Sequence, residues 1–132
     1  MSDSKKKIAL LLRRRDTLLY KIASIDAVIR KYEADVSLDC NKVEQVVIEI
    51  TGVPVDKLKS VSMEKDVVYS RYLIWHICMK HYDYTFQYLG FIYNRHHTTV
   101  MNGVKTMQGF IDVGGKYPAD MIPVIEKKLN ID

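Results

Sequence analysis

The stretch from Tyr84 to Met107 constrains the fold more than any other part of the sequence, because it contains two helical patterns around one turn signal. Thr85 can cap the first helix, and Asn94 tolerates the positive φ that a sharp reversal needs. Apolar residues recur at helical spacing on both sides of Asn94. They are Phe86, Leu89 and Phe91 or Ile92 in the first pattern, and Val100, Val104, Met107 and Ile111 in the second. The stretch therefore predicts two helices that share one core.

The second pattern opens with polar residues. These are Arg95, His96, His97, Thr98 and Thr99. A helix N-terminus offers free backbone N–H groups and a partial positive charge, which suit a phosphate group. Guanidinium, imidazole and hydroxyl groups can also form hydrogen bonds with the edges of bases. We therefore interpret the stretch as a helix-turn-helix that presents this turn to the major groove of DNA.

The same residues carry a resemblance to a known family. The run Arg95-His96-His97-Thr98-Thr99-Val100, followed by Gly103 and Lys105, resembles the Arg-Asp-His-Thr-Thr-Val signature of the C-terminal DNA-binding domain of the bacterial replication initiator DnaA. Further apolar and basic positions follow in the same order. They are Val43, Val46, Val47, Ile50, Val55, Leu58, Lys59, Arg71, Leu89 and Gly90. The resemblance covers roughly residues 38–111.

This resemblance implies an all-α fold, a helix-turn-helix bundle of the DnaA C-terminal or Trp-repressor-like type. It also implies base contacts from His97, Thr98 and Thr99, and phosphate contacts from Arg71, Arg95 and Lys105. His96 and Asn102 complete the predicted DNA-binding set. The residues themselves leave a second role open for Arg71, because its guanidinium could instead pair with Glu64 or Asp66.

Three features of the sequence differ from the family pattern. His96 stands at a position that is usually Asp, and the turn before Arg95 is one residue shorter. The basic loop that reaches the minor groove is replaced by the stretch from Ser60 to Lys65. The family's DNA target sequence is therefore not implied for this chain.

The distribution of charge weighs against DNA binding. The formal net charge is +4, but residues 1–35 contain nine Lys or Arg and five Asp or Glu, whereas residues 36–132 contain eleven of each kind. Salt-sensitive attraction to nucleic acid arises from cations that neutralise phosphates. A neutral domain must therefore bind DNA with a few well-placed cations.

Residues 5–34 contain neither Gly nor Pro and predict a long N-terminal helix. Two rows of positions follow a heptad spacing. One row is Leu11, Leu18, Ile25 and Tyr32, and the other is Ile8, Arg15, Ile22 and Ile29. We favour a coiled coil at residues 1–36 that forms a homodimer, with packing of this helix on the chain's own second domain as the alternative.

The rest of the chain predicts a domain at residues 37–132. Asp35 to Asp39 breaks the heptad pattern, and Ser37 or Asp39 can cap a helix that continues to about Thr51. Gly52 stops that helix, and a short helical turn in which Val55 and Leu58 pack follows. Three more segments complete the prediction. They are a loop at residues 60–65, a helix of about fifteen residues from Asp66, and a last helix at about 119–130 behind a Gly- and Pro-containing loop.

Catalytic and metal sites are not predicted. Gly115-Lys116 lacks a nucleotide-binding motif, because Phe110 and Tyr117 occupy its other required positions. His76, Cys78 and His81 are spaced so that a helix points them in different directions. We expect no enzyme, no cofactor, no metal, no small-molecule substrate and no membrane span.

Two further features bear on the setting and on the core. Cys40 and Cys78 form no disulfide framework and favour a reducing cytoplasm. The four tyrosines at 82, 84, 88 and 93 could stack on bases, although we favour rings at the edge of the core with solvated hydroxyls.

Two functions remain compatible with the sequence. The first is sequence-specific binding of double-stranded DNA, in the control of replication initiation or in transcription regulation. The second is a protein–protein interaction module that uses the coiled coil and a repurposed helix-turn-helix. We favour the first, because His97, Thr98 and Thr99 stand between Arg95 and Lys105.

Overall fold

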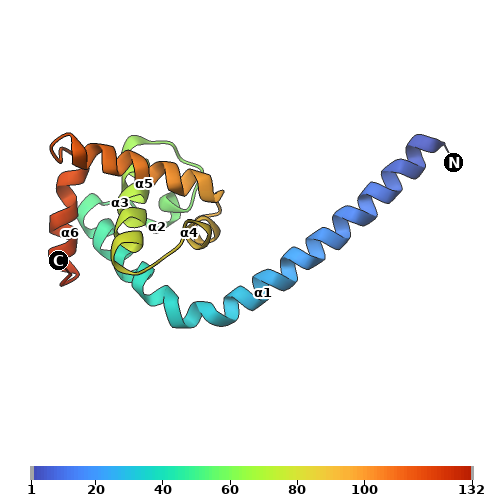
Figure 1. Ribbon diagram of the computed structural model, residues 1–132, viewed down its shortest axis with the longest axis horizontal. Helices are drawn as coiled ribbons and strands as arrows, with labels where there is room; N and C mark the ends of the chain where they lie inside the picture. The colour runs from blue at the N-terminus through green and yellow to red at the C-terminus, as the bar shows by residue number, and fades with distance from the viewer. Residues whose placement is uncertain (1, 132) are drawn as a thin grey trace. The chain divides into compact units, whose positions relative to one another are not determined.

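The computed structural model describes residues 2–131, and the side chains of all of these except residues 34–38. The regular secondary structure of the described residues is entirely helical, which confirms the predicted all-α fold (Figure 1). The elements are α1 (Asp3–Thr51), α2 (Val55–Leu58), α3 (Lys65–His81), α4 (Phe86–Ile92), α5 (His97–Asp112), the 3-10 helix η1 (Ala119–Met121) and α6 (Ile122–Lys128).

The first helix is continuous from Asp3 to Thr51, so the predicted break at Asp35 to Asp39 is wrong. None of those five residues is Gly or Pro, and the backbone can therefore keep its helical hydrogen bonds through them. The candidate cap Ser37 lies among the residues whose side chains are not described. The chain nevertheless forms two compact units, one that ends at Ser37 and one that begins at Leu38.

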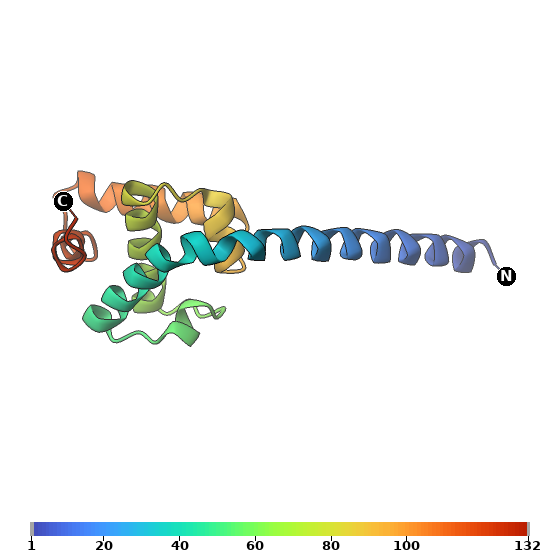
Figure 2. The ribbon, with the colours of Figure 1, turned by 90° about the horizontal axis from the view of Figure 1, so that it is seen from below.

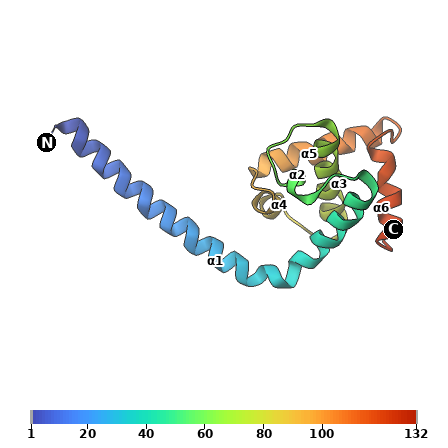
Figure 3. The same ribbon diagram turned by 180° about the vertical axis from the view of Figure 1, so that it is seen from behind.

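Helix α3 lies at the centre of the second unit. It packs against α2, α5 and α6, as Figures 1 and 3 show from opposite sides. Its buried side chains include Leu73, Ile74, Trp75 and Ile77, each at most 1% exposed. Other helices contribute the rest of the core. These contributions include Val43 and Val47 from α1, Leu58 from α2, Leu89 from α4, Val100 and Met107 from α5, and Ile122 and Ile125 from α6.

The helix-turn-helix is formed by α4 and α5, which pack against each other (Figure 2). Thr85 caps α4 as predicted, since its hydroxyl accepts a hydrogen bond from the N–H of Tyr88 at 3.1 Å. Asn94 has a φ of 52° in the turn, which is also as predicted. The Arg95 N–H donates to the carbonyl of Gly90 at 2.7 Å. A Cβ at Gly90 would lie 2.5 Å from the Arg95 carbonyl oxygen, so the turn needs glycine there.

The remaining boundaries differ from the predictions by small amounts. Gly52, with a φ of 74°, follows the end of α1. Leu58 is fully buried as expected, but Val55 is 38% exposed, whereas Val53 is buried at 7% exposed. Helix α3 begins at Lys65, one residue before the predicted start. The predicted last helix is a 3-10 turn followed by α6, which ends at Lys128 and covers the core.

Helix α5 crosses α3 at Gly103. A Cβ at this position would lie 2.7 Å from Cδ1 of Tyr72 and 2.9 Å from Cε3 of Trp75. These distances are shorter than van der Waals contact, and Trp75 is held within the core at 1% exposed. The close crossing that a glycine inside this helix predicts is therefore present.

The crossing generates a test with a control in the same helix. Gly103→Ala should lower the free energy of unfolding by about 1–3 kcal/mol, because the added methyl overpacks the ring edges. Gly109 has no atom near its Cβ position, so Gly109→Ala should raise stability by up to about 1 kcal/mol through helix propensity. Urea denaturation of both variants measures the difference, and equal stabilisation by the two substitutions would contradict the close crossing.

Candidate nucleic-acid interface

The first turn of α5 projects polar side chains into solvent. His96 is the N-cap residue, and α5 itself begins at His97. Thr98 and Thr99 are exposed, and His97 is partly exposed. The first turn contains no acidic residue, so no side-chain carboxylate there offsets the positive end of the helix dipole. This end of α5 is suited to an anionic partner.

The cap of α5 also orders the side chain of Thr98. The Nδ1 atom of His96 accepts a hydrogen bond from the Thr98 N–H at 3.3 Å, and it lies 2.8 Å from the Thr98 hydroxyl oxygen. The imidazole rings of His96 and His97 lie 4.3 Å apart between centroids. When the Thr98 hydroxyl donates to Nδ1, its oxygen keeps lone pairs that can accept a hydrogen bond from a base amino group. His96 therefore performs the capping role that Asp performs in many helices.

A polar stripe continues from this turn along α5. Thr98, Asn102 and Lys105 are spaced four and three residues apart, which places them on one face of the helix. All three are exposed. Val100, Gly103 and Met107 are buried on the other side. We refer to Thr98, Asn102 and Lys105 as the polar stripe.

Arg95 lies in the turn before α5, outside the helix. It is partly buried, and its guanidinium donates to the carbonyls of Tyr93 at 3.1 Å and Ser60 at 2.5 Å. The predicted placement of Arg95 in the first helical turn is therefore wrong. Its guanidinium instead ties the turn of the helix-turn-helix to the loop that follows α2.

Arg71 differs most from its predicted place. It is 3% exposed, and its guanidinium donates to carbonyls at the end of α2 and in the loop that follows α2. The acceptors are Leu58 at 2.7 Å, Ser62 at 2.7 Å, Lys57 at 3.1 Å and Ser60 at 2.7 Å. Burial, and then the nearby charge of Arg95, lower the pKa of Arg71 below its ordinary value. This arrangement corrects both sequence interpretations, because Arg71 neither presents its charge to a phosphate nor pairs with a carboxylate in the described chain.

The sequence contained a signal for the burial of Arg71. Arg71 lies four residues after Val67 and four before Trp75, and both of these are 1% exposed. Helical spacing therefore places Arg71 on the buried face of α3 rather than beside it. A buried guanidinium must have several acceptors, and the carbonyls of an irregular segment provide them.

The loop at residues 59–64 exposes two apolar side chains beside this anchored backbone. Val61 is 87% exposed and Met63 is 79% exposed. Ser60 and Ser62 on either side of Val61 are held through their carbonyls by Arg71 and, for Ser60, by Arg95 as well. The loop is thus fixed to the same turn that precedes α5.

A buried polar cluster joins α1 to the turn, and sequence reasoning missed it. Glu44 is 4% exposed and accepts a hydrogen bond from the Tyr93 hydroxyl at 2.6 Å. The ammonium of Lys59 lies 3.8 Å from the same carboxylate oxygen. Burial raises the pKa of Tyr93 well above its ordinary value. Glu44 lies between Val43 and Val47 in sequence, and its position next to the buried stripe was the available signal.

The tyrosines pack with the core, as favoured, but the hydroxyl oxygens of Tyr84, Tyr88 and Tyr93 are not solvated. Tyr93 is fully buried, and Tyr84 is 7% exposed. The Cys40 N–H donates to the Tyr84 hydroxyl oxygen at 3.1 Å. Both residues thereby tie α1 to the helix-turn-helix, and neither presents a free ring face for stacking on bases.

His76, Cys78 and His81 do not form a metal-binding group in the structure. His76 is buried, and burial lowers its pKa. His81 instead meets Glu126 at 2.5 Å, where α3 approaches α6. Among the side chains that the structure describes, no three from His, Cys, Asp or Glu group in a way that could hold a metal ion. None of the helices in the described chain combines the length and the apolar character needed to cross a membrane.

A comparison with known protein families also identifies a helix-turn-helix in this chain. The family model described as the bacterial DnaA protein helix-turn-helix matches residues 40–107. This range contains α2, α3 and α4 and most of α5, including the whole polar stripe. No curated protein matches the chain.

The position of Arg71 predicts that removal of its guanidinium lowers the stability of the fold. Arg71→Met keeps much of the side-chain volume but removes every donor, so up to four carbonyls lose a charge-assisted hydrogen bond. We expect the free energy of unfolding to fall by about 2–4 kcal/mol. Arg30→Met, which changes an exposed arginine of α1, should change it by less than about 0.5 kcal/mol. Denaturation monitored by Trp75 fluorescence compares the two, and a full-stability Arg71→Met variant would contradict the anchoring role.

Proposed function

The chain belongs to the bacterial DnaA helix-turn-helix family, and on that premise we propose that it binds double-stranded DNA in a sequence-specific manner through the N-terminal half of α5. Membership of this family indicates DNA binding. The observation that carries the proposal is the exposed polar surface at the tip of α5, which has no acidic residue in its first turn. A helix of this kind can enter the major groove with its N-terminal residues against the bases.

The side chains divide into two roles in this proposal. His97, Thr98, Thr99 and Asn102 contact base edges, because imidazole, hydroxyl and amide groups can read donor and acceptor patterns there. Lys105 lies one turn further along α5 and contacts a phosphate group. His96 acts as a positioning residue, since its ring orders Thr98.

Arg71 and Arg95 also act as positioning residues rather than as phosphate ligands. Their guanidinium groups share the carbonyl of Ser60, which fixes the loop and the turn before α5 relative to each other. Rigid support of this kind keeps the contacting side chains in place before DNA binds.

The biological role that follows is control of replication initiation or of transcription by a DNA-binding protein that does not act as an enzyme. Residues 3–33 of α1 would pair two copies of the chain, since the exposed heptad seam needs a partner. The cysteines Cys40 and Cys78 are free and buried, in keeping with a reducing cytoplasm as the place of action.

A second function is favoured by one observation. Val61 and Met63 are largely exposed in a loop whose backbone is held in place. Apolar side chains on an ordered loop suit a protein partner. In this alternative the helix-turn-helix domain acts as a protein-binding module, and duplex DNA does not bind.

Salt titration distinguishes the two functions. Affinity for a mixed-sequence duplex, measured by fluorescence anisotropy, should fall steeply with salt. Lys105→Ala should lower the magnitude of the slope of log K against log salt by about 1, because one phosphate contact is lost. Lys127→Ala removes an exposed cation from α6 and should leave the slope unchanged. Salt-independent binding, or equal effects of the two variants, would contradict the proposed interface.

Sequence selectivity has its own matched pair of variants. Thr98→Ala should reduce discrimination between selected and scrambled duplexes by about 1–3 kcal/mol, since it removes a base contact at the tip. Thr106→Ala, two turns further along α5 and also exposed, should retain it. Both effects can be measured by competition after selection of bound duplexes from a random pool. Full discrimination by Thr98→Ala would argue against base contact at this position.

A further inference from the structure

The first unit of the chain consists of a single helix with an apolar seam open to solvent. The seam positions recur at alternating spacings of three and four residues. Those with large apolar or aromatic side chains that are 54–67% exposed are Ile8, Leu11, Leu18, Ile22, Ile25 and Tyr32. Arg15 interrupts the seam. An apolar surface of this length on one helix is the pattern of a two-stranded coiled coil.

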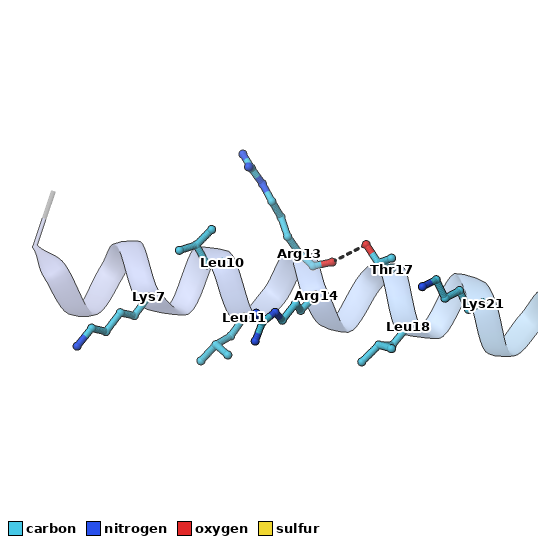
Figure 4. Close-up of a pocket in the computed structure, with 8 residues that line it drawn as sticks. All are labelled: Lys7, Leu10, Leu11, Arg13, Arg14, Thr17, Leu18 and Lys21. Carbon is cyan, nitrogen blue, oxygen red and sulfur yellow. Dashed lines mark hydrogen bonds between the residues drawn. The ribbon is translucent and has the colours of Figure 1, made fainter.

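Cations border the first half of the seam. A groove on this part of α1 is formed by the side chains shown in Figure 4. Lys7, Leu11, Arg14 and Leu18 project from one side of the helix there, whereas Leu10 and Arg13 project from the other. The two leucines of the seam thus lie between basic side chains, and an occupant with acidic or uncharged borders would complement them.

The charge is distributed unevenly along the helix. Residues 3–18 contain six Lys or Arg against two Asp or Glu, whereas residues 19–33 contain three against two. A second copy laid in the same direction would place the two basic halves together. A second copy laid in the opposite direction would place each basic half beside a nearly neutral half.

We propose that a second copy of the chain occupies this seam in the antiparallel orientation, which extends the self-association in the proposed function. In an antiparallel coiled coil the two rows of the seam face each other. One register pairs every seam position of residues 8–32, with Leu11 against Ile29 of the second copy, Leu18 against Ile22 of the second copy, and Arg15 against Ile25 of the second copy. Each aliphatic layer of the seam is then covered.

Arg15 decides the orientation. In a parallel pair Arg15 would face Arg15 of the second copy within the seam, and two like charges would be desolvated together. In the antiparallel pair it faces an isoleucine, along which its aliphatic stem can pack while the guanidinium reaches solvent.

The edges of the seam contribute less to the choice. The antiparallel register brings Lys5 near Glu33 of the second copy, and it brings the two copies of Lys21 near each other at the solvated edge. The parallel register would instead bring Lys21 near Asp26. These edge pairs are exposed and have small effects compared with two arginines inside the seam.

The orientation sets the distance between the two Ser37 backbones, at which the coiled-coil units end. In this register Ser37, where the first unit ends, lies level with residue 3 of the second copy. The two Ser37 backbones are therefore about 50 Å apart along the helix axis, at a rise of about 1.5 Å per residue. The antiparallel dimer thus attaches its two DNA-binding units at opposite ends of the coiled coil.

Disulfide trapping tests the orientation on the full-length chain. Leu11→Cys and Ile29→Cys variants are prepared separately and mixed, and wild type is oxidised in parallel as a control for the buried native thiols. We expect sedimentation to show a dimer and the mixture to form a disulfide between the two variants. Leu11→Cys alone should remain uncrosslinked, because its two copies lie about 27 Å apart along the axis.

Each other outcome overturns the proposal in a different way. A disulfide within Leu11→Cys alone, with no mixed product, would show a parallel dimer and leave the proposed self-association intact. A dimer that forms neither disulfide would place the interface outside the seam. A monomer that still binds duplex would remove the self-association while leaving the DNA-binding proposal standing.

Discussion

The close crossing of α5 over α3 at Gly103 holds the rest of the second unit in place. Because no side chain separates the two helices there, α5 rests directly on the rings of Tyr72 and Trp75. Val100 and Met107 are buried on either side of this contact. The N-terminal turn of α5 therefore extends from a rigid support, and its polar side chains need not pack against anything. Gly90 allows a second close approach, between α4 and the turn that leads into α5.

Cations serve inside the domain as well as on its surface. Arg71 donates to four carbonyls at the end of α2 and in the loop after it, and Arg95 shares one of those acceptors. Arg71 and Arg95, which the family resemblance assigns to phosphate contacts, thus order the loop beside the helix-turn-helix. DNA binding by a domain with equal numbers of acidic and basic residues would then rest on its exposed lysines, of which Lys105 lies on the polar stripe. In the proposed dimer, a second DNA-binding unit would raise affinity for DNA through effective concentration.

Local signals in the sequence were sufficient for the helix-turn-helix. Thr85, Asn94 and Gly103 each impose a requirement on their immediate backbone or contact, and the structure meets all three. The continuity of α1 was not predicted, since Ser and Asp near residue 37 fit both a cap and a helix interior. Helical spacing could have indicated the burial of Arg71, but not its acceptors, which lie nine to fourteen residues away at the end of α2 and in the loop after it. Interactions of that kind depend on the tertiary fold rather than on periodicity.

The tip of α5 is the surface that we propose to face DNA. Amide chemical shifts test this placement without knowledge of the target sequence. A short duplex is added to isotope-labelled protein at physiological salt, and the backbone amides are followed through the titration. The largest changes should occur at His97, Thr98 and Thr99, with smaller ones at Asn102 and Lys105. Changes confined to α6 or to the loop at Val61 and Met63, or no changes at saturating duplex, would contradict the claim.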